Sequence, residues 1–317
     1  TKLVYGNERK IPAHEWASFS YQVFAAVVNY GTFAQAAGAL NVTPSAVSHS
    51  ISQLESDLGF PLFIRSRSGA ELTADGQVVL PVIQGILNLE DQLQQVADNI
   101  NGLAAGRVRI GAFSSVSTNW LPPIIRAFNK KYPRVQIELV QAGFNEIVEQ
   151  VRTGSVDIGF SLLPVDAPVT VEPLVQDPIF CVTPRSFTPR SGKYVDDEDI
   201  GKRHFILQQQ DYDRDTKRAL DRYNVSTNSI NYSIDDQSIL SMVESGLGMG
   251  ILPQLALSKL VGDVNTYPFS EPFARTLCLL INPTQEHAPS VSRMRVEIER
   301  YLATRYGTAY MGNKPRS

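Results

Sequence analysis

The sequence predicts a mainly α/β protein that begins with a small helical region. Residues 16–76 carry apolar positions at helical spacing, and residues 77–104 continue as one long amphipathic segment. From Arg107 onward, short apolar runs of strand character alternate with helical segments. Such an alternation favours a parallel sheet with helices on its faces. The series is long enough to predict two α/β lobes that enclose a cleft.

The composition fits a folded protein of two or three domains. The chain has 317 residues, of which 43% are hydrophobic and 19% charged, and its formal net charge is −3. This length exceeds what one core usually serves. No apolar run approaches the ~20 residues that cross a bilayer, and residues 1–18 lack the apolar core of a secretory signal. We therefore expect a cytoplasmic protein with no membrane partner.

The cysteines and histidines indicate neither a disulfide framework nor a metal site. Cys181 and Cys278 each lie inside an apolar run, which favours small buried hydrophobes over a redox pair. The four histidines lack the spacing of metal ligands: His14, His49, His204 and His287. No nucleophile triad, carboxylate pair or glycine-rich phosphate loop is evident. We therefore predict no cofactor, no metal and no enzymatic activity.

Two short helices separated by a tight turn are predicted near the N-terminus. The first runs from Phe33 to Leu40, and the turn occupies residues 41–44. Thr43 suits the N-cap of the second helix and Pro44 its first helical position. One face of the second helix is apolar: Val47, Ile51, Leu54 and Leu58. The opposite face is polar: Ser45, Ser48, His49, Ser52 and Gln53. This is a helix-turn-helix, whose second helix enters the DNA major groove.

Residues 77–104 predict one helix of roughly 40 Å at ~1.5 Å per residue. Its apolar positions recur every three or four residues: Val79, Val82, Ile83, Ile86, Leu89, Leu93, Val96 and Ile100. An apolar stripe of this length on an isolated helix is expected to pack against another apolar surface. We favour a dimerising linker over packing against the helix's own domain.

These features together resemble the LysR-type transcriptional regulators. The matching residues are Phe33…Ala36-Ala37…Leu40, Val42 to Ser48, Ile51…Leu54-Glu55…Leu58-Gly59, Leu62-Phe63…Arg65 and Leu72-Thr73…Gly76. With the long helix and a two-lobed part that opens RVRIG, the resemblance covers nearly the whole chain beyond residue 18. A helix-turn-helix alone is a weak signal, but this series of features in this order is specific.

The resemblance implies the domain organisation. An N-terminal extension (1–18) precedes a winged helix-turn-helix (19–76) and a dimerisation helix (77–104). The regulatory domain (105–317) resembles type II periplasmic binding proteins, with one lobe at about 107–165 plus 266–317 and another at about 166–265. The implied partners are double-stranded promoter DNA, a small-molecule effector between the lobes, and further copies in a homodimer or homotetramer. Contact with RNA polymerase is left open.

The resemblance also assigns DNA-facing residues on the second helix and the wing: Thr43, Pro44, Ser45, Ser48, His49, Gln53, Arg65 and Arg67. Residues 14–76 hold two basic side chains against five acidic ones, and His49 stands where many relatives carry arginine. Lys and Arg normally supply most nonspecific DNA affinity, so backbone amides, hydroxyls and several subunits must contribute more. Lys2, Arg9 and Lys10 either add charge or belong to a disordered extension.

Polar residues at the predicted strand ends are the candidate effector site: Ser114, Ser115, Ser117, Phe144, Ser161, Gln208, Asp236 and Gln237. By the resemblance, Ser115 falls where relatives hold an effector carboxylate or sulfate. Ser117 and Thr118 equally suit a helix cap. Because no Arg or Lys stands at these strand ends, we expect neutral dipoles to hold a small organic monoanion. Asp236 would suit either a helix N-cap or a cationic group of the effector.

Two other function classes remain as alternatives. A solute-binding protein would explain the two lobes, but such a protein would have to be exported. Its function would also leave the helix-turn-helix unexplained. A cytosolic enzyme on the same scaffold would need converging catalytic groups, which the sequence does not offer. Both are therefore disfavoured against a DNA-binding regulator.

Overall fold

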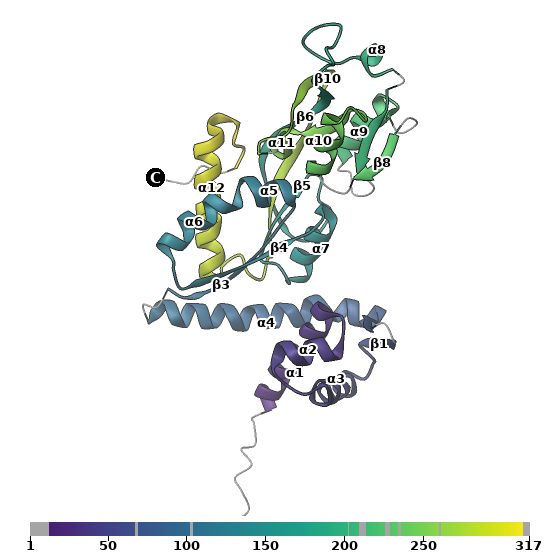
Figure 1. Ribbon diagram of the computed structural model, residues 1–317. Helices are drawn as coiled ribbons and strands as arrows, with labels where there is room; N and C mark the ends of the chain where they lie inside the picture. The colour runs from purple at the N-terminus through teal and green to yellow at the C-terminus, as the bar shows by residue number, and fades with distance from the viewer. Residues whose placement is uncertain are drawn as a thin grey trace, which may run out of the picture. The chain divides into compact units, whose positions relative to one another are not determined.

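The computed structural model describes residues 13–66, 69–101, 104–201, 203–208, 214–225, 229–233, 236–259 and 261–312. The chain forms two compact units that divide between Gln94 and Gln95 (Figure 1). We call them the N-terminal unit and the regulatory unit. In the described residues no helix combines the length and the apolar character needed to span a membrane.

The N-terminal unit is a small helical core with a two-stranded wing. Its elements are α1 (Ala13–Tyr30), α2 (Phe33–Leu40), α3 (Pro44–Leu58), β1 (Phe63–Ser66), β2 (Gly69–Leu72) and the first part of α4 (Ala74–Ile100). The wing strands pair in antiparallel register, with Phe63 opposite Leu72. Phe24, Val47, Ile51 and Leu62 are fully buried in the shared core.

The turn between α2 and α3 forms as the sequence predicts. Asn41 ends α2 in the left-handed region at φ 55°. The Thr43 hydroxyl accepts a hydrogen bond from the Ala46 amide at 3.2 Å, and Pro44 opens α3. Both helix-start predictions are confirmed. The predicted burial of Leu58 is wrong, because this side chain lies in the last turn of α3, beyond the core, and is 38% exposed.

The regulatory unit is built on a six-stranded sheet in the order β4-β3-β5-β10-β6-β9. These strands are β3 (Gly106–Ala112), β4 (Val135–Gln141), β5 (Ile158–Leu162), β6 (Thr170–Pro184), β9 (Gly250–Pro253) and β10 (Val264–Ile281). Strand β3 is parallel to β4 and β5, whereas β10 runs antiparallel to β5 and β6. The predicted alternation of parallel strands and helices in the first lobe is therefore confirmed.

Helices and one small sheet complete the regulatory unit. The first lobe carries α5 (Ser114–Asn119), α6 (Leu121–Lys131), α7 (Phe144–Thr153), α12 (Pro289–Tyr306) and the short η2 (Gly307–Ala309). The second lobe carries α8 (Asp197–Ile200), β7 (Phe205–Gln208), α9 (Arg214–Arg222), β8 (Ser229–Ser233) and α10 (Asp236–Glu244). The short α11 (Gln254–Leu257) follows β9 and buries Leu255 in the first core. Strands β7 and β8 pair in parallel.

Two long strands run through both lobes. Leu174 and Val175 of β6 pack in the first core, whereas Ile179 of the same strand packs in the second. Strand β10 returns in the same way between Phe273 and Leu277. The segments VNTYPF and TLCLLI belong to this one strand, which has a register shift after Pro268. The chain therefore passes from the first core to the second within β6 and returns to the first within β10. Both crossings lie later in the chain than the predicted lobe boundaries near 165 and 265.

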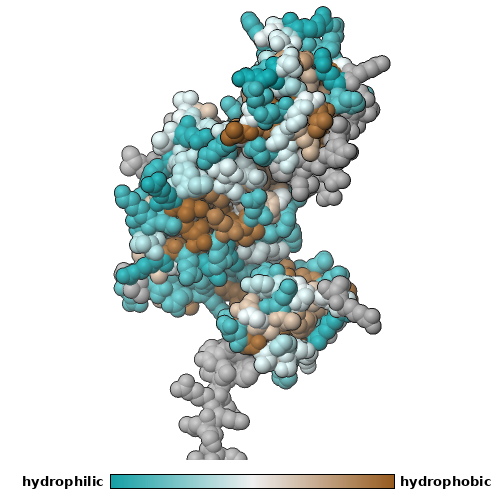
Figure 2. All heavy atoms as spheres, viewed as in Figure 1, coloured by the Kyte–Doolittle hydropathy of each residue, from teal (hydrophilic) through white to brown (hydrophobic). Residues whose placement is uncertain are grey.

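Most of the visible surface of the regulatory unit is polar, with an apolar patch over α6 and α12 (Figure 2). On α12, Val296 is among the exposed large apolar side chains. The hydroxyl of Tyr306, at the end of this helix, accepts a hydrogen bond from the Trp120 indole at 3.0 Å. The first lobe therefore closes its core against α12 and still leaves apolar surface outside.

Candidate DNA-binding and effector-binding sites

Helix α3 presents a short polar face to solvent. Ser45, His49, Ser52 and Gln53 are exposed, and Ser48 is partly buried. The Thr43 and Ser45 hydroxyls lie 3.0 Å apart, and Gln53 donates to Asp57 at 2.8 Å. The outward placement of this face is confirmed. Its contacts with bases or phosphates stay predictions.

Arg65 lies against this face of α3. Its Nη1 donates to Ser48 Oγ at 3.1 Å and its Nη2 lies 3.4 Å from Ser52 Oγ. The guanidinium also covers the Phe33 ring at 4.6 Å from the centroid. Helix α3 has no Lys or Arg of its own, so Arg65 of β1 supplies positive charge to its outer surface. Arg67, the other predicted wing residue, lies outside the described residues.

Glu55 has a structural task that sequence reasoning missed. Its Oε1 accepts hydrogen bonds from the amides of Leu62 at 2.7 Å and Phe63 at 3.2 Å. The carboxylate therefore ties α3 to the start of the wing. This also turns one of the five acidic side chains in this region toward the backbone.

The apolar stripe of α4 is largely exposed. Val82 is 62% exposed and Leu93 is 71% exposed, and further members of the stripe are exposed as well: Ile86, Leu89, Val96 and Ile100. Ile83 is buried in the core of the N-terminal unit. Val79, Leu80 and Leu87 also pack against this core. The helix thus uses one apolar side for its own domain and leaves a second apolar row exposed among the described residues.

The carboxyl ends of three neighbouring parallel strands bring predicted effector residues together. Ser115 follows β3, Phe144 follows β4, and Ser161 lies in β5. The Phe113 and Phe144 rings meet edge to face at 4.8 Å, and Ser161 Oγ donates to the Phe144 carbonyl at 3.2 Å. Ser115 and Ser161 are buried. Ser161 is therefore bonded to the backbone of Phe144, whose ring packs against Phe113.

The remaining predicted effector residues are less converged. Ser114 is exposed at the start of α5. Asp236 and Gln237 open α10, and the Gln237 amide donates to the Val261 carbonyl at 3.1 Å. The side chain of Gln208 lies outside the described residues.

The helix-cap alternative for Ser117 and Thr118 is wrong. Both residues lie inside α5, whose N-cap is Phe113 without a side-chain cap. The Ser117 hydroxyl instead donates to the Ala112 carbonyl at 3.4 Å. Because α5 begins at Ser114, directly after β3, no residue of the hydroxyl run stands in the N-cap position.

A buried arginine beside Ser115 was missed from the sequence. Arg275 of β10 stands opposite Asp177 of β6, and both side chains are 5% exposed. Arg275 Nε donates to Asp177 Oδ2 at 3.0 Å, while Nη2 lies 3.4 Å from Ser115 Oγ. A buried arginine thus lies beside Ser115, although no Arg or Lys stands at the predicted strand ends. That neutral dipoles hold the effector stays a prediction. A lone arginine inside the apolar run FARTLCLL was the available signal.

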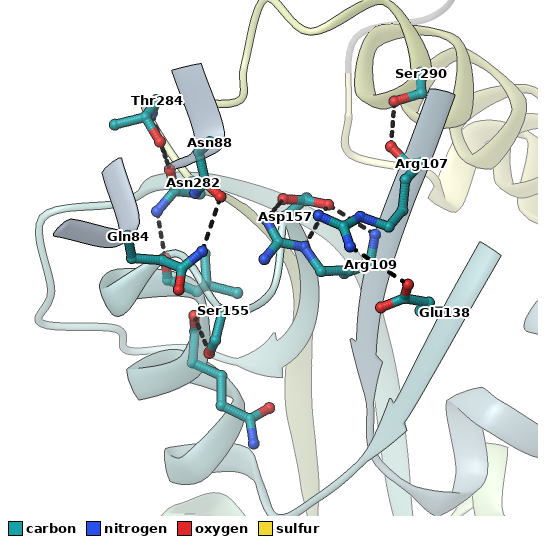
Figure 3. A network of polar contacts seen from close by, with 12 residues as sticks. Gln84, Asn88, Arg107, Arg109, Glu138, Ser155, Asp157, Asn282, Thr284 and Ser290 are labelled. Atoms are coloured by element: carbon teal, nitrogen blue, oxygen red, sulfur yellow. Dashed lines mark hydrogen bonds and ion pairs between the residues drawn. The ribbon is translucent and has the colours of Figure 1, made fainter. Parts of the chain in front are cut away.

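A second buried pair, Arg109 with Asp157, lies within the first lobe (Figure 3). Asp157 Oδ2 accepts from the Arg109 amide at 2.7 Å and from its Nε at 3.2 Å, and Oδ1 accepts from Nη2 at 2.5 Å. This pair joins β3 to the segment just before β5. It resembles the Arg275 pair in chemistry, since each joins a buried guanidinium to a buried carboxylate.

Two cavities of the regulatory unit lie away from the predicted effector residues. One of about 120 Å³ is lined by Trp120, Asp177, Leu255 and Tyr306, among others. The other, of about 610 Å³, lies in the second lobe beside Phe187, Arg203, His204 and Met249. The described residues contain no cluster of three or more His, Cys, Asp or Glu side chains suited to a metal ion.

Both cysteines are free and buried, as predicted. Burial raises the pKa of the Cys181 thiol and of the Cys278 thiol to about 12. Because the thiolate is the reactive form, these side chains act as small apolar residues at neutral pH.

Comparison with known proteins agrees with this architecture. Residues 20–77 match the family model of bacterial regulatory helix-turn-helix proteins of the lysR family, and residues 101–303 match the LysR substrate binding domain. The chain is 31% identical over 273 residues to the probable HTH-type transcriptional regulator LrrA of Synechococcus elongatus, covering 85% of this chain and 92% of that protein. The uncharacterized regulator YvbU of Bacillus subtilis is 30% identical, with 75% and 81% covered.

Solved structures show the same fold at lower identity. A full-length OxyR variant from Pseudomonas aeruginosa superposes with a TM-score of 0.70 at 21% identity, covering 95% of this chain and 98% of that one. Full-length CbnR in complex with its target DNA gives a TM-score of 0.58 at 20% identity, with 90% and 99% covered. With both domain models matched in order and most of the chain covered, the protein belongs to the LysR family of bacterial transcriptional regulators.

Proposed function

We propose that this chain regulates transcription by reading promoter DNA with α3 and the wing, under the control of a small molecule bound at the lobes of the regulatory unit. The observation that carries the proposal is the polar face of α3 with Arg65 held against Ser48 and Ser52. Hydroxyl, imidazole and amide groups on a helix can read base edges in the major groove. The guanidinium adds attraction for phosphates beside them.

The shortage of basic residues gives the DNA contact a particular character. Of the two basic residues in 14–76, Arg65 of β1 places its guanidinium against α3, and Arg67 is outside the described residues. Few phosphates are therefore neutralised by basic side chains, so the DNA releases few counterions when the protein binds. The affinity then depends more on backbone amides, hydroxyls and the number of subunits. His49 is exposed and suits a base or phosphate contact.

Oligomerisation follows from the exposed stripe of α4. A row that includes Val82, Leu89 and Leu93 is costly to leave in water, and a second copy of the same helix covers it by symmetry. We infer a homodimer through α4. The apolar patch over α6 and α12 supports a second pairing through the regulatory units, which gives a homotetramer.

For the effector we propose a site at the carboxyl ends of β3, β4 and β5, completed by the start of α10. Ser161 is hydrogen-bonded to Phe144 in the first lobe, and Ser115 follows the neighbouring strand β3. Asp236 and Gln237 face this site from the second lobe in the proposal. Strand ends of this kind are the usual ligand position in open α/β sheets. The relatives are named as regulators, which favours a binding role in the cytoplasm over catalysis.

The test is a footprint of the full-length protein on the DNA next to its own gene. Protection of a site with two-fold symmetry, lost in a variant without the α3 polar face, is the expected result. The matched control replaces exposed polar residues of α9 instead. Equal binding to unrelated DNA, or protection that survives loss of the α3 face, contradicts the proposal.

A further inference from the structure

The larger of the two cavities described above lies beside α8, which Figure 1 shows at the end of the second lobe farthest from the first lobe. Its volume of about 610 Å³ is within the usual range of ligand pockets. The lining comes from the end of β6 and the residues after it, from α8, from the start of β7 and from the turn before β9. None of the lining residues is a predicted effector residue, so an inference about this cavity does not rest on the proposed effector site.

Backbone hydrogen bonds hold two walls of the cavity together. The Met249 amide donates to the His204 carbonyl at 2.9 Å, and the Ile206 amide donates to the Met249 carbonyl at 2.8 Å. Gly248 lies so close to this strand that a Cβ on it would stand 2.8 Å from the His204 carbonyl oxygen. The turn before β9 is therefore fixed against the start of β7, and a ligand meets a preformed surface.

Arg203 presents an oriented guanidinium group at the cavity. Its Nε donates to the Asp199 carbonyl at 2.7 Å, and its guanidinium carbon lies 4.9 Å from the centroid of the Phe187 ring. These two contacts hold the plane of the group. Within the part of the chain that the structure describes, Nη1 and Nη2 donate to no acceptor. The two nitrogens form an edge that can hold both oxygens of a carboxylate.

The acidic side chains of the lining are already engaged by other donors. Asp199 is buried, and its two oxygens accept from the amides of Arg190 and Asp196 at 3.0 and 3.3 Å. Glu198 forms an ion pair with Arg190. The position on the outer edge of Arg203 is therefore open to an anionic group from outside. Because the Arg and Lys residues of the lining are matched in number by its Asp and Glu residues, a single negative charge suits the cavity better than several.

Apolar surface completes the lining. The Leu247 side chain is large and apolar, and it is 55% exposed. Pro184 and Met249 also line the cavity. An apolar group that covers Leu247 removes this surface from water, which is favourable.

We propose that this cavity is a second ligand site of the protein and that its ligand is a monocarboxylate with an apolar body. The carboxylate lies on Nη1 and Nη2 of Arg203, and the apolar body covers Leu247. Short fatty acids and aryl-substituted acids have this chemistry.

The first experiment compares five probes by calorimetry on the full-length protein: phenylacetate, hexanoate, their two amides, and acetate. The amides keep the shape and lose the charge, whereas acetate keeps the carboxylate and loses the apolar body. We expect at least one of the two larger acids to bind about tenfold more tightly than its amide and than acetate, because each comparison removes one contact. Acids that bind no better than their amides, or no better than acetate, overturn the proposal. Absence of binding by both larger acids at about 10 mM, which exceeds a millimolar dissociation constant, also overturns it.

Variants of Arg203 test the carboxylate contact. Arg203→Met removes the charged edge and keeps an unbranched chain over Phe187, so the affinity for the tighter acid should fall about tenfold. Arg203→Lys restores the charge without the planar edge and should recover only part of this loss. Arg218→Met removes an exposed arginine of α9 that does not line the cavity, and it is the matched control. Wild-type affinity in Arg203→Met, or an equal loss in Arg218→Met, overturns the assignment to Arg203.

A thiol introduced at Leu247 tests the location of the ligand. Both native cysteines are buried, so the variant Leu247→Cys has one accessible thiol. The tighter acid, at saturating concentration, should slow its alkylation by iodoacetamide severalfold, and the amide should not. Val261→Cys, at a position of the same lobe that is 82% exposed and outside the lining, should react at the same rate with and without the acid. Protection of neither thiol, or of both, overturns the location and leaves the proposed effector site and the DNA contact standing.

Discussion

Arg65 Nη1 and Ser48 Oγ are joined by a hydrogen bond of 3.1 Å, which connects the wing to the recognition helix. The wing arginine is thus held over α3 by the same serine that faces the major groove in the proposed complex. In the proposed complex Arg65 contacts phosphate, whereas Ser48 contacts a base edge. Their substitutions should therefore give different patterns on different DNA.

Arg65→Ala should weaken binding to all DNA sequences alike, because a phosphate contact carries no base information. Ser48→Ala should cost about 1–3 kcal/mol at the specific site only, as expected for a lost base contact. Fluorescence anisotropy on operator and scrambled duplexes measures both. Arg185→Ala, which removes an exposed arginine of the regulatory unit, is the control. If Arg65→Ala relaxed specificity at particular bases while nonspecific binding held, the wing assignment would be wrong.

Salt dependence should be shallow for a DNA-binding dimer. Two basic residues in 14–76 allow about two phosphate contacts per subunit, which gives a slope of log K against log[salt] of roughly −2 per subunit at ~0.9 ions per contact. Titrations from low to moderate salt measure it. A slope steeper than about −8 for a dimer on one site would show that cations outside the N-terminal unit touch DNA.

The local elements could be predicted because their causes are local. The Thr43 cap, the Pro44 start and the apolar face with Val47 and Ile51 depend on neighbours within one helix and its turn. Leu58 was misjudged because periodicity shows which face a residue occupies and not whether the core extends to it. The sequence likewise could not show that β10 runs through both lobes, because its pairing partner β6 is distant in the sequence.

In the candidate sites, too, the sequence predicted local features but not the contacts between distant elements. Ser115, Phe144 and Ser161 follow from the rule that strand ends meet at one edge. Arg275 and Asp177 lie 98 residues apart, so only the register of β6 with β10 brings them to Ser115. Arg65 was placed on a wing but not on α3, because its partners Ser48 and Ser52 belong to another element. Contacts between distant elements were the part that spacing could not reveal.

A charge in the stripe of α4 should dissociate the proposed dimer. Leu93 is 71% exposed in the chain alone, and in the dimer we propose that it is covered by the partner helix. Leu93→Glu would bury an unpaired carboxylate, so the dissociation constant should rise by about two orders of magnitude. Sedimentation or light scattering at micromolar concentration measures this, with Gln92→Glu on the same helix as control. An unchanged mass for Leu93→Glu would place the dimer contact elsewhere.

Neither cysteine should react readily in the folded protein. Burial raises both thiol pKa values to about 12, so the thiolate fraction at pH 8 is small, and the groups are also shielded. Iodoacetamide labelling followed by mass spectrometry should be slow in the native protein and fast for both cysteines in denaturant. Native labelling should increase as pH rises, because deprotonation favours the thiolate. Rapid labelling of either cysteine in the native protein at pH 8 would contradict this prediction and favour the redox-pair interpretation.

The Arg109 and Asp157 pair should reveal how much of the first lobe depends on balanced buried charge. Asp157→Asn leaves the Arg109 guanidinium, 10% exposed, without its counter-charge, and a buried pair broken on one side typically costs about 3–5 kcal/mol. Arg109→Met with Asp157→Asn removes both charges and keeps an oxygen for the Arg109-position amide, so most of that loss should be recovered. Urea unfolding of the regulatory unit, followed through Trp120 fluorescence, measures both variants. A double variant as unstable as the single one would mean that the guanidinium contributes through packing and hydrogen bonds rather than through charge balance.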